Sequence, residues 1–238
     1  MRIGGFQKLT LVDYPGKIAA TVFTVGCSFR CPFCHNPELV LRAQFPAPNK
    51  MEQEFFKHLE KRKGKLEGVC ITGGEPTIQP DIIPFIKKIK EMGFLVKLDS
   101  NGTRPDILRQ VFKEKLVDFV AMDIKNTPEK YSETTGVETK NFASLLDRVK
   151  LSVDLIRNSG IPYEFRTTVV PGIHSEEDFL EIGKWLEGSM SYFLQEYRDG
   201  ILLDPNLRKK TNGKKIDLKK IKKSLLPFFQ KVGIRYNN

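Results

Sequence analysis

The sequence alternates between short apolar runs rich in β-branched residues and longer segments whose apolar residues recur at helical spacing. The first kind predicts six strands: Ile18–Val25, Gly68–Thr72, Phe94–Leu98, Val117–Met122, Tyr163–Val170 and, more weakly, Ser191–Leu194. The second kind predicts five helices: Met51–Arg62, Asp81–Met92, Pro105–Lys115, Asn141–Asn158 and one that begins after Ser175, where Asp178 completes a capping box. Strands in alternation with helices predict an α/β fold with a parallel sheet and helices outside it. Right-handed crossovers allow an open doubly wound sheet or a curved partial barrel, and periodicity does not decide between them.

Composition restricts the class of protein. The chain has 238 residues, of which 40% are apolar and 29% charged, as in ordinary folded domains. It contains no run of about 18 uncharged apolar residues, which excludes a membrane-spanning helix. Its beginning has no apolar secretory segment, so we expect a cytoplasmic protein.

Positive charge is concentrated at the end of the chain. Residues 201–238 hold 11 Lys and Arg against Asp204 and Asp217, whereas residues 1–200 are nearly neutral. We therefore expect one domain over residues 1–200 and a basic, helical extension over 201–238. The extension suits nucleic acid, a membrane surface or an acidic protein face, and a solvated helix face explains it equally well. Its aromatic residues lie outside the lysine cluster, which does not favour nucleic-acid binding.

Three of the four cysteines lie in one loop directly after the first predicted strand. Cys27, Cys31 and Cys34 form a cluster typical of a metal site, not of a disulfide framework. Thiolates suit zinc, copper(I) or iron–sulfur clusters, but a closed zinc site needs a fourth ligand. The usual ferredoxin spacings are also absent. Three ligands leave one metal position open, and Cys70, in an apolar strand, is expected in the core.

Polar and glycine-rich segments follow the other strands, at the sheet edge where such folds place their function. The segments are Gly73-Gly74-Glu75-Pro76, Asp99-Ser100-Asn101-Gly102, Asp123-Ile124-Lys125 and Pro171-Gly172-Ile173-His174, with Arg166 and Thr168 alternating along the fifth strand. Taken singly, these segments also fit ordinary turns and ion pairs between neighbouring loops. We expect His174 to be a loop residue without a role.

The cysteine loop carries a family resemblance. The segment Gly26-Cys-Ser-Phe-Arg-Cys-Pro-Phe-Cys-His-Asn-Pro-Glu38 resembles the cluster loop of radical S-adenosylmethionine (SAM) enzymes, in which an aromatic residue such as Phe33 precedes the last cysteine. Together with the run from Leu9 to Lys17, it is most similar to the activases of glycyl radical enzymes, and among these to the activases of anaerobic ribonucleoside-triphosphate reductases. The resemblance covers roughly residues 5–200 and leaves out the basic extension.

The resemblance implies a partial (β/α)6 TIM-like barrel and a set of cofactor contacts. Cys27, Cys31 and Cys34 would hold three irons of one 4Fe–4S cluster, whose fourth iron binds the amino and carboxylate groups of SAM. The residues expected at SAM are Phe33, Gly73, Gly74, Glu75, Asp99, Ser100, Asn101, Asp123, Lys125, Arg166 and Thr168. In related activases the matching aspartates line a monovalent-cation site beside SAM, and the lysine lies near its carboxylate.

The implied activity is radical generation on a protein. Flavodoxin or ferredoxin would reduce the cluster, SAM would split into methionine and a 5′-deoxyadenosyl radical, and this radical would take a hydrogen atom from a glycine of a partner enzyme. Anaerobic ribonucleoside-triphosphate reductase is the first choice of partner. Pyruvate formate-lyase, another glycyl radical enzyme and a small-molecule substrate are the alternatives. A non-enzymatic metal protein would leave the strand-end motifs unexplained. The oxygen sensitivity of an open-site cluster implies an anaerobic cytoplasm.

Overall fold

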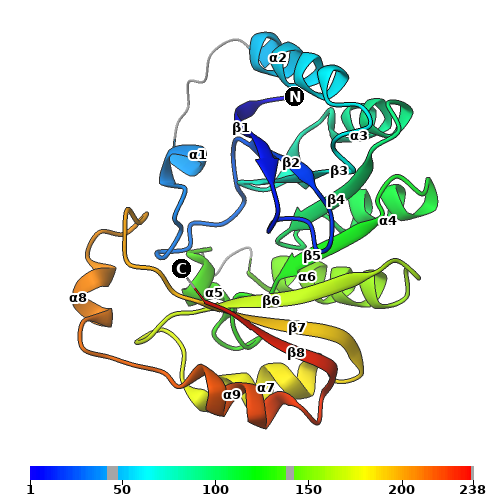
Figure 1. Cartoon of the computed structure of the whole chain (residues 1–238). Helices are drawn as coiled ribbons and strands as arrows, with labels where there is room; N and C mark the ends of the chain where they lie inside the picture. The colour runs from blue at the N-terminus through cyan, green and yellow to red at the C-terminus, as the bar shows by residue number, and fades with distance from the viewer. Residues whose placement is uncertain (42–47, 138–141, 237–238) are drawn as a thin grey trace.

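The computed structural model describes residues 1–41, 48–137 and 142–236. Its centre is an eight-stranded sheet in which the strands lie side by side in chain order (Figure 1). The strands are β1 (Ile3–Thr10), β2 (Ala19–Thr24), β3 (Gly68–Gly73), β4 (Leu95–Ser100), β5 (Phe119–Asp123), β6 (Tyr163–Val169), β7 (Ser189–Glu196) and β8 (Phe229–Arg235).

The six predicted strands are confirmed as β2 to β7, and neighbouring members of this set pair in parallel. The sheet curves but does not close, because β1 and β8 are its two edges (Figure 1). Of the two architectures that the sequence allowed, the partial barrel is therefore the one observed. Val69, Cys70 and Ile71 in β3 have no exposed surface, as expected of a parallel strand covered on both faces.

Helices flank the sheet (Figure 1). They are α1 (Pro37–Leu41), α2 (Pro48–Lys61), the 3-10 helix η1 (Pro76–Ile78), α3 (Ile82–Glu91), α4 (Pro105–Lys113), α5 (Tyr131–Thr135), α6 (Phe142–Arg157), α7 (Glu176–Trp185), α8 (Leu207–Thr211) and α9 (Leu218–Leu225). The five predicted helices correspond to α2, α3, α4, α6 and α7, although Asn141, the expected start of α6, lies outside the described residues. None of the helices in the described part of the chain could span a membrane.

The capping box predicted for α7 is present. The side chain of Ser175 accepts a hydrogen bond from the backbone N–H of Asp178, and the Asp178 carboxylate accepts one from the backbone N–H of Ser175. These bonds satisfy two of the donors that a helix start leaves unpaired. They fix the point at which the chain turns from the end of β6 back along the sheet.

Strand β1 was not predicted. It pairs antiparallel to β2, with Phe6 opposite Val22. The strand contains two glycines, and Gln7, Lys8 and Leu9 are exposed, so it lacks the continuous apolar run that marks a buried strand. Such an edge strand can be recognised only from its pairing with the neighbouring strand, here β2.

The C-terminal extension contains the expected helices, α8 and α9, and also strand β8. This strand pairs in parallel with β7 from Ser189 and Phe229 to Gln195 and Arg235. The apolar face of α9 is buried and packs near α7. The prediction of a purely helical extension was therefore incomplete, because the extension also adds strand β8 to the sheet. The division into two domains at residue 200 stays a prediction.

Candidate active site

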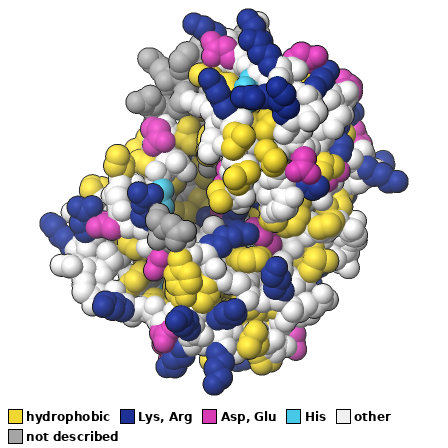
Figure 2. Space-filling model, in the orientation of Figure 1, with side chains coloured by type: hydrophobic (Ala, Val, Ile, Leu, Met, Phe, Trp, Pro, Cys, Tyr) yellow, Lys and Arg dark blue, Asp and Glu magenta, His cyan; other side chains and the backbone are white. Residues whose placement is uncertain are grey.

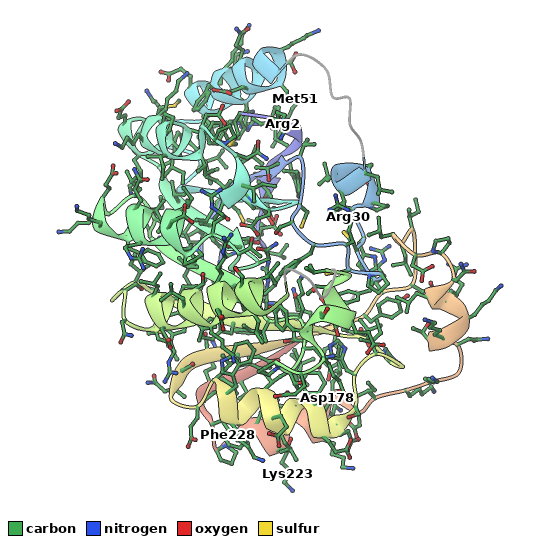
Figure 3. All side chains as sticks on the ribbon, turned by 180° about the vertical axis from the view of Figure 1, so that it is seen from behind. Arg2, Arg30, Met51, Asp178, Lys223 and Phe228 are labelled. Atoms are coloured by element: carbon green, nitrogen blue, oxygen red, sulfur yellow. The ribbon has the colours of Figure 1, made fainter. Side chains whose placement is uncertain are left out.

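The cysteine loop leaves the C-terminal end of β2 and is held from two sides. The backbone N–H of Arg30 donates to the carbonyl oxygen of Thr135 in α5, at 2.7 Å. From the C-terminal extension, the backbone N–H of Leu203 donates to the carbonyl oxygen of Cys34 at 3.1 Å, and that of Asp204 donates to the carbonyl oxygen of Pro32 at 3.0 Å. Figure 3 places Arg30 between α1 and the segment that leads to α8. Contacts distant in sequence therefore fix the shape of the loop.

The three cysteines differ in burial. Cys31 is buried, whereas Cys27 and Cys34 are half-buried and face the same pocket. Burial raises the pKa of Cys27 to about 11 and that of Cys31 to about 12, so both are thiols at neutral pH until a metal displaces the proton. Asn101 donates to the Cys27 sulfur over 3.7 Å.

The arrangement of these cysteines bears on the kind of metal group that they could hold. Across residues 1–41, 48–137 and 142–236, no three His, Cys, Asp or Glu side chains are placed to hold a single metal ion together. A closed zinc site needs all its ligands to converge on one atom. In a 4Fe–4S cluster each thiolate binds a different iron. Cys27, Cys31 and Cys34 line one pocket, so their thiol groups suit the ligation of such a cluster.

Glu75 is the best-connected carboxylate of the pocket. It has no exposed surface, and it accepts hydrogen bonds from the backbone and hydroxyl of Thr77, from the Ser100 hydroxyl at 2.9 Å and from the Asn101 N–H at 2.6 Å. Burial raises the pKa of Glu75, and these four donors oppose that rise. Glu75 therefore joins the end of β3 to the end of β4.

Gly73 and Gly74 bring the end of β3 against the start of the cysteine loop. A Cβ on Gly74 would lie 1.9 Å from the carbonyl oxygen of Gly26, and one on Gly73 would lie 2.3 Å from the backbone nitrogen of Thr24. Gly73 also has a φ of +112°. The close backbone contact between the end of β3 and the segment Thr24–Gly26 therefore requires both glycines.

Five charged side chains form a continuous chain across β4, β5 and β6. Lys97 pairs with Asp99, Asp99 with Arg166, Arg166 with Asp123, and Asp123 with Lys125. We call this set the ion chain. Burial alone would raise the pKa values of both carboxyls, but the neighbouring cations hold them below their usual range. Both are therefore ionised at neutral pH.

A single pocket brings these groups together. The residues predicted at the cluster and at SAM all line it: Cys27, Cys31, Phe33, Cys34, Gly73, Gly74, Glu75, Asp99, Ser100, Asn101, Asp123, Lys125, Arg166 and Thr168. Figure 2 shows the surface hollowed near the middle of the face drawn there, between the upper and lower parts of the molecule. The pocket lies at the C-terminal edge of the strands, where the sequence analysis expected function.

Two important side chains were missed or underrated. Lys97 is only 2% exposed, and sequence reasoning passed over it because it stands inside an apolar strand. The available signal was that Lys97 and Asp99 are two residues apart and so point to the same side of β4. His174, expected to be a loop residue without a role, is buried and bonds to the backbone of Lys125 and Val170.

Comparison with known families agrees with this arrangement. The model of the radical SAM superfamily matches residues 21–186, which include the cysteine loop and every strand from β2 to β6 except the start of β2. The chain belongs to the radical SAM superfamily. Radical SAM enzymes use a 4Fe–4S cluster and SAM, so the expected cofactors are those of the superfamily, and this chain is an enzyme of that class.

Several of the similar sequences are activating enzymes of glycyl radical enzymes. A protein of Methanocaldococcus jannaschii named as a candidate glycyl-radical enzyme activating enzyme is 32% identical over 99% of this chain and 96% of its own length. The pyruvate formate-lyase-activating enzymes of Streptococcus mutans and Clostridium pasteurianum are each 30% identical over 74% of this chain, and over 68% and 72% of their own lengths. Within the radical SAM superfamily, the chain belongs with the glycyl-radical-enzyme activating enzymes.

Solved structures show the same fold at lower identity. A radical SAM methyltransferase from Sphaerobacter thermophilus matches 97% of this chain and 69% of its own, with a TM-score of 0.68 and 14% identity. Streptococcus suis SuiB bound to S-adenosylmethionine matches 90% of this chain and 48% of its own, with a TM-score of 0.65 and 16% identity. The chain therefore spans about half the length of SuiB.

Proposed function

We propose that this radical SAM enzyme installs a glycyl radical on a partner enzyme, and that the partner is an anaerobic ribonucleoside-triphosphate reductase. The observation that carries the proposal is the pocket at the strand ends, which combines a three-cysteine loop with two cations and two carboxylates of the ion chain. The pyruvate formate-lyase-activating enzymes among the similar sequences support the alternative partner, pyruvate formate-lyase.

We assign the residues of the pocket as follows. Cys27, Cys31 and Cys34 hold the cluster, and the backbone of the Gly73–Pro76 segment faces the amino group of SAM. Lys125 and Arg166 face its carboxylate, because they are the cations of the ion chain that line the pocket. Glu75, with all its bonds directed to the protein, keeps the two strand ends in place.

A cluster held by Cys27, Cys31 and Cys34, together with SAM, would supply the one-electron chemistry needed to take a hydrogen atom from the target glycine. The protein positions both groups and excludes water from them. No side chain needs to move a proton in this scheme. An acidic one-electron carrier, flavodoxin or ferredoxin, would provide the electron in an anaerobic cytoplasm.

Partner docking is assigned to the part of the extension around α8. Arg208, Lys209, Lys210, Lys214 and Lys215 are all exposed, and the segment just before α8 bonds to the cysteine loop. Figure 2 shows Lys and Arg side chains at the left edge of the molecule, on the side where Figure 1 places α8. This placement supports an acidic surface of the partner enzyme beside the pocket, because opposite charges steer docking.

The test is anaerobic reconstitution with iron and sulfide, reduction with dithionite, and an assay for 5′-deoxyadenosine. We expect product from the natural protein and none from Cys31→Ala, which loses a cluster ligand. Cys70→Ala is the matched control, because Cys70 lies outside the loop and its loss should leave the iron content unchanged.

The second stage adds the reductase and looks for a glycyl radical by electron paramagnetic resonance. A radical on the reductase supports the preferred partner, and a radical only on pyruvate formate-lyase supports the alternative. A protein that takes up zinc but never iron, or that holds a full cluster and cleaves no SAM with either partner, would contradict the proposed function.

A further inference from the structure

The two aspartates of the ion chain have no free carboxylate oxygen. Oδ1 of Asp99 contacts Lys97 and Oδ2 accepts from Arg166 at 2.9 Å. Oδ1 of Asp123 contacts Arg166 and Oδ2 accepts from Lys125 at 2.9 Å. The family resemblance led us to expect a monovalent-cation site at these aspartates, but ammonium and guanidinium groups contact all four carboxylate oxygens. This arrangement does not fit an added monovalent cation.

Lys97 is the unexpected member of the set. Its ammonium group is buried at the inner side of the sheet, where it contacts Asp99 and lies 3.7 Å from the sulfur of Cys70. A buried ammonium is stable only when an opposite charge is close, and Asp99 supplies that charge. Lys97 does not line the pocket itself, so it acts on the pocket through Asp99 and Arg166.

The charge balance shows what Lys97 contributes. With three cations and two carboxylates, the ion chain carries one net positive charge. Without Lys97, the remaining four groups would be neutral, and a bound monovalent cation would restore the single positive charge. A built-in ammonium and a monovalent cation therefore have the same electrostatic effect at this position.

We propose that Lys97 is a positioning residue that replaces the monovalent cation, so that this enzyme binds SAM without added sodium or potassium. The side chain fixes Asp99, and Asp99 in turn orients the guanidinium of Arg166 towards the pocket. The net positive charge then favours the carboxylate of SAM over water. The inference rests on the proposed function, because it assumes that SAM is the ligand of this pocket.

The experiment measures SAM affinity of the cluster-loaded protein by equilibrium dialysis in choline chloride, sodium chloride and potassium chloride at equal ionic strength. The natural protein should bind SAM equally, within about twofold, in all three salts. Lys97→Ala should bind about tenfold more weakly in choline chloride, and sodium or potassium should recover part of the loss. Lys97→Arg, which keeps the charge, should stay close to the natural protein and show no salt preference.

Lys90→Ala is the matched control, because Lys90 pairs with Asp118, outside the residues that line the pocket, and its loss should leave SAM affinity unchanged. A natural protein whose SAM affinity rises more than about fivefold with sodium or potassium overturns the proposal. So does a folded Lys97→Ala with undiminished affinity. If Lys97→Ala does not fold, the salt comparison on the natural protein decides. Failure of the proposed function has a different outcome, since SAM then stays uncleaved even where it binds.

Discussion

His174 donates a hydrogen bond of 2.8 Å from Nε2 to the backbone carbonyl oxygen of Lys125. Its Nδ1 accepts from the N–H of Val170 at 3.0 Å, which leaves the single ring proton on Nε2. The ring is buried, and burial lowers the pKa of His174, so the imidazole is neutral near pH 7. His174 therefore joins the loop after β5, which carries Lys125, to the loop after β6.

Removal of this ring should destabilise the fold. His174→Ala leaves two buried backbone groups without partners, and each costs about 1–3 kcal/mol, so the free energy of unfolding should fall by roughly 2–6 kcal/mol. Urea unfolding measures it. The control is His58→Ala, whose ring bonds to the carbonyl oxygen of Lys8 at the exposed surface and should cost less than about 1 kcal/mol. Equal losses in the two variants would show that His174 does not link the loops.

The same residue predicts a pH dependence of stability. Because the pKa of His174 in the folded protein lies below the ordinary value of 6.5, the unfolded chain binds more protons in mild acid. The contribution of the neutral ring is complete above about pH 6.5 and is lost as the pH falls towards the folded pKa. The charged groups that face the ring are Asp178, which raises its pKa, and Lys130, which lowers it.

Urea unfolding between pH 5 and pH 8 should therefore show a steeper loss of stability towards acid for the natural protein than for His174→Gln. His35, whose pKa burial also lowers, is present in both proteins and does not affect the difference. Parallel pH profiles would mean that His174 is not held neutral.

Gly74→Ala should separate the cysteine loop from the end of β3. The added Cβ would lie 1.9 Å from the carbonyl oxygen of Gly26. A Cβ is fixed to its own backbone and the oxygen belongs to the backbone, so neither atom can rotate away. We expect the free energy of unfolding to fall by about 3 kcal/mol or more, together with poor iron uptake. Gly5→Ala is the matched control, since its Cβ would meet no heavy atom within 4 Å. Normal stability and iron content in Gly74→Ala would refute the close contact.

Much of this arrangement was predictable from the sequence because parallel strands and strand ends have local patterns. Strands β2 to β7 are apolar and β-branched, and polar residues at their ends must meet at one edge of a parallel sheet. Strand β1 escaped prediction because one edge is exposed, and β8 because Lys231 interrupts its apolar residues. Lys97 escaped because a local pattern says nothing about which charge balances a buried ammonium. That information lies in the fold, which brings Asp99 and Arg166 together.

The basic segment at α8 predicts salt-dependent activation of the partner. Deleting residues 206–238 is a poor test, because the deletion would remove β8 and the buried face of α9. Reversing charge at Lys209 and Lys210 leaves the core intact, since both are exposed. We expect glycyl-radical formation to slow about tenfold at low salt and less at high salt, with SAM cleavage by dithionite unchanged.

The matched control reverses the charges of Lys219 and Lys223, which belong to the same extension and are also exposed. Figure 3 places Lys223 on α9, at the outer side of the molecule and away from the cysteine loop. This pair should leave radical formation unchanged. Equal slowing by both pairs would mean that overall charge, and not the α8 segment, controls docking.

The pair of Arg235 and Glu164 tests whether the extension folds with the barrel. Arg235 in β8 binds both carboxylate oxygens of Glu164 in β6, at 2.7 and 2.6 Å, and Glu164 is only 1% exposed. Arg235→Met would leave a buried carboxylate without its cation, which should lower the free energy of unfolding by about 3 kcal/mol. Adding Glu164→Gln should recover part of this loss, because the uncompensated charge is then gone.

Two signals would follow the unfolding: the fluorescence of Trp185, the single tryptophan, at the end of α7, and far-ultraviolet circular dichroism. Both should report one shared urea transition that shifts in both variants. A barrel transition that stays in place while only a separate, smaller transition shifts would instead support an independent extension beyond residue 200.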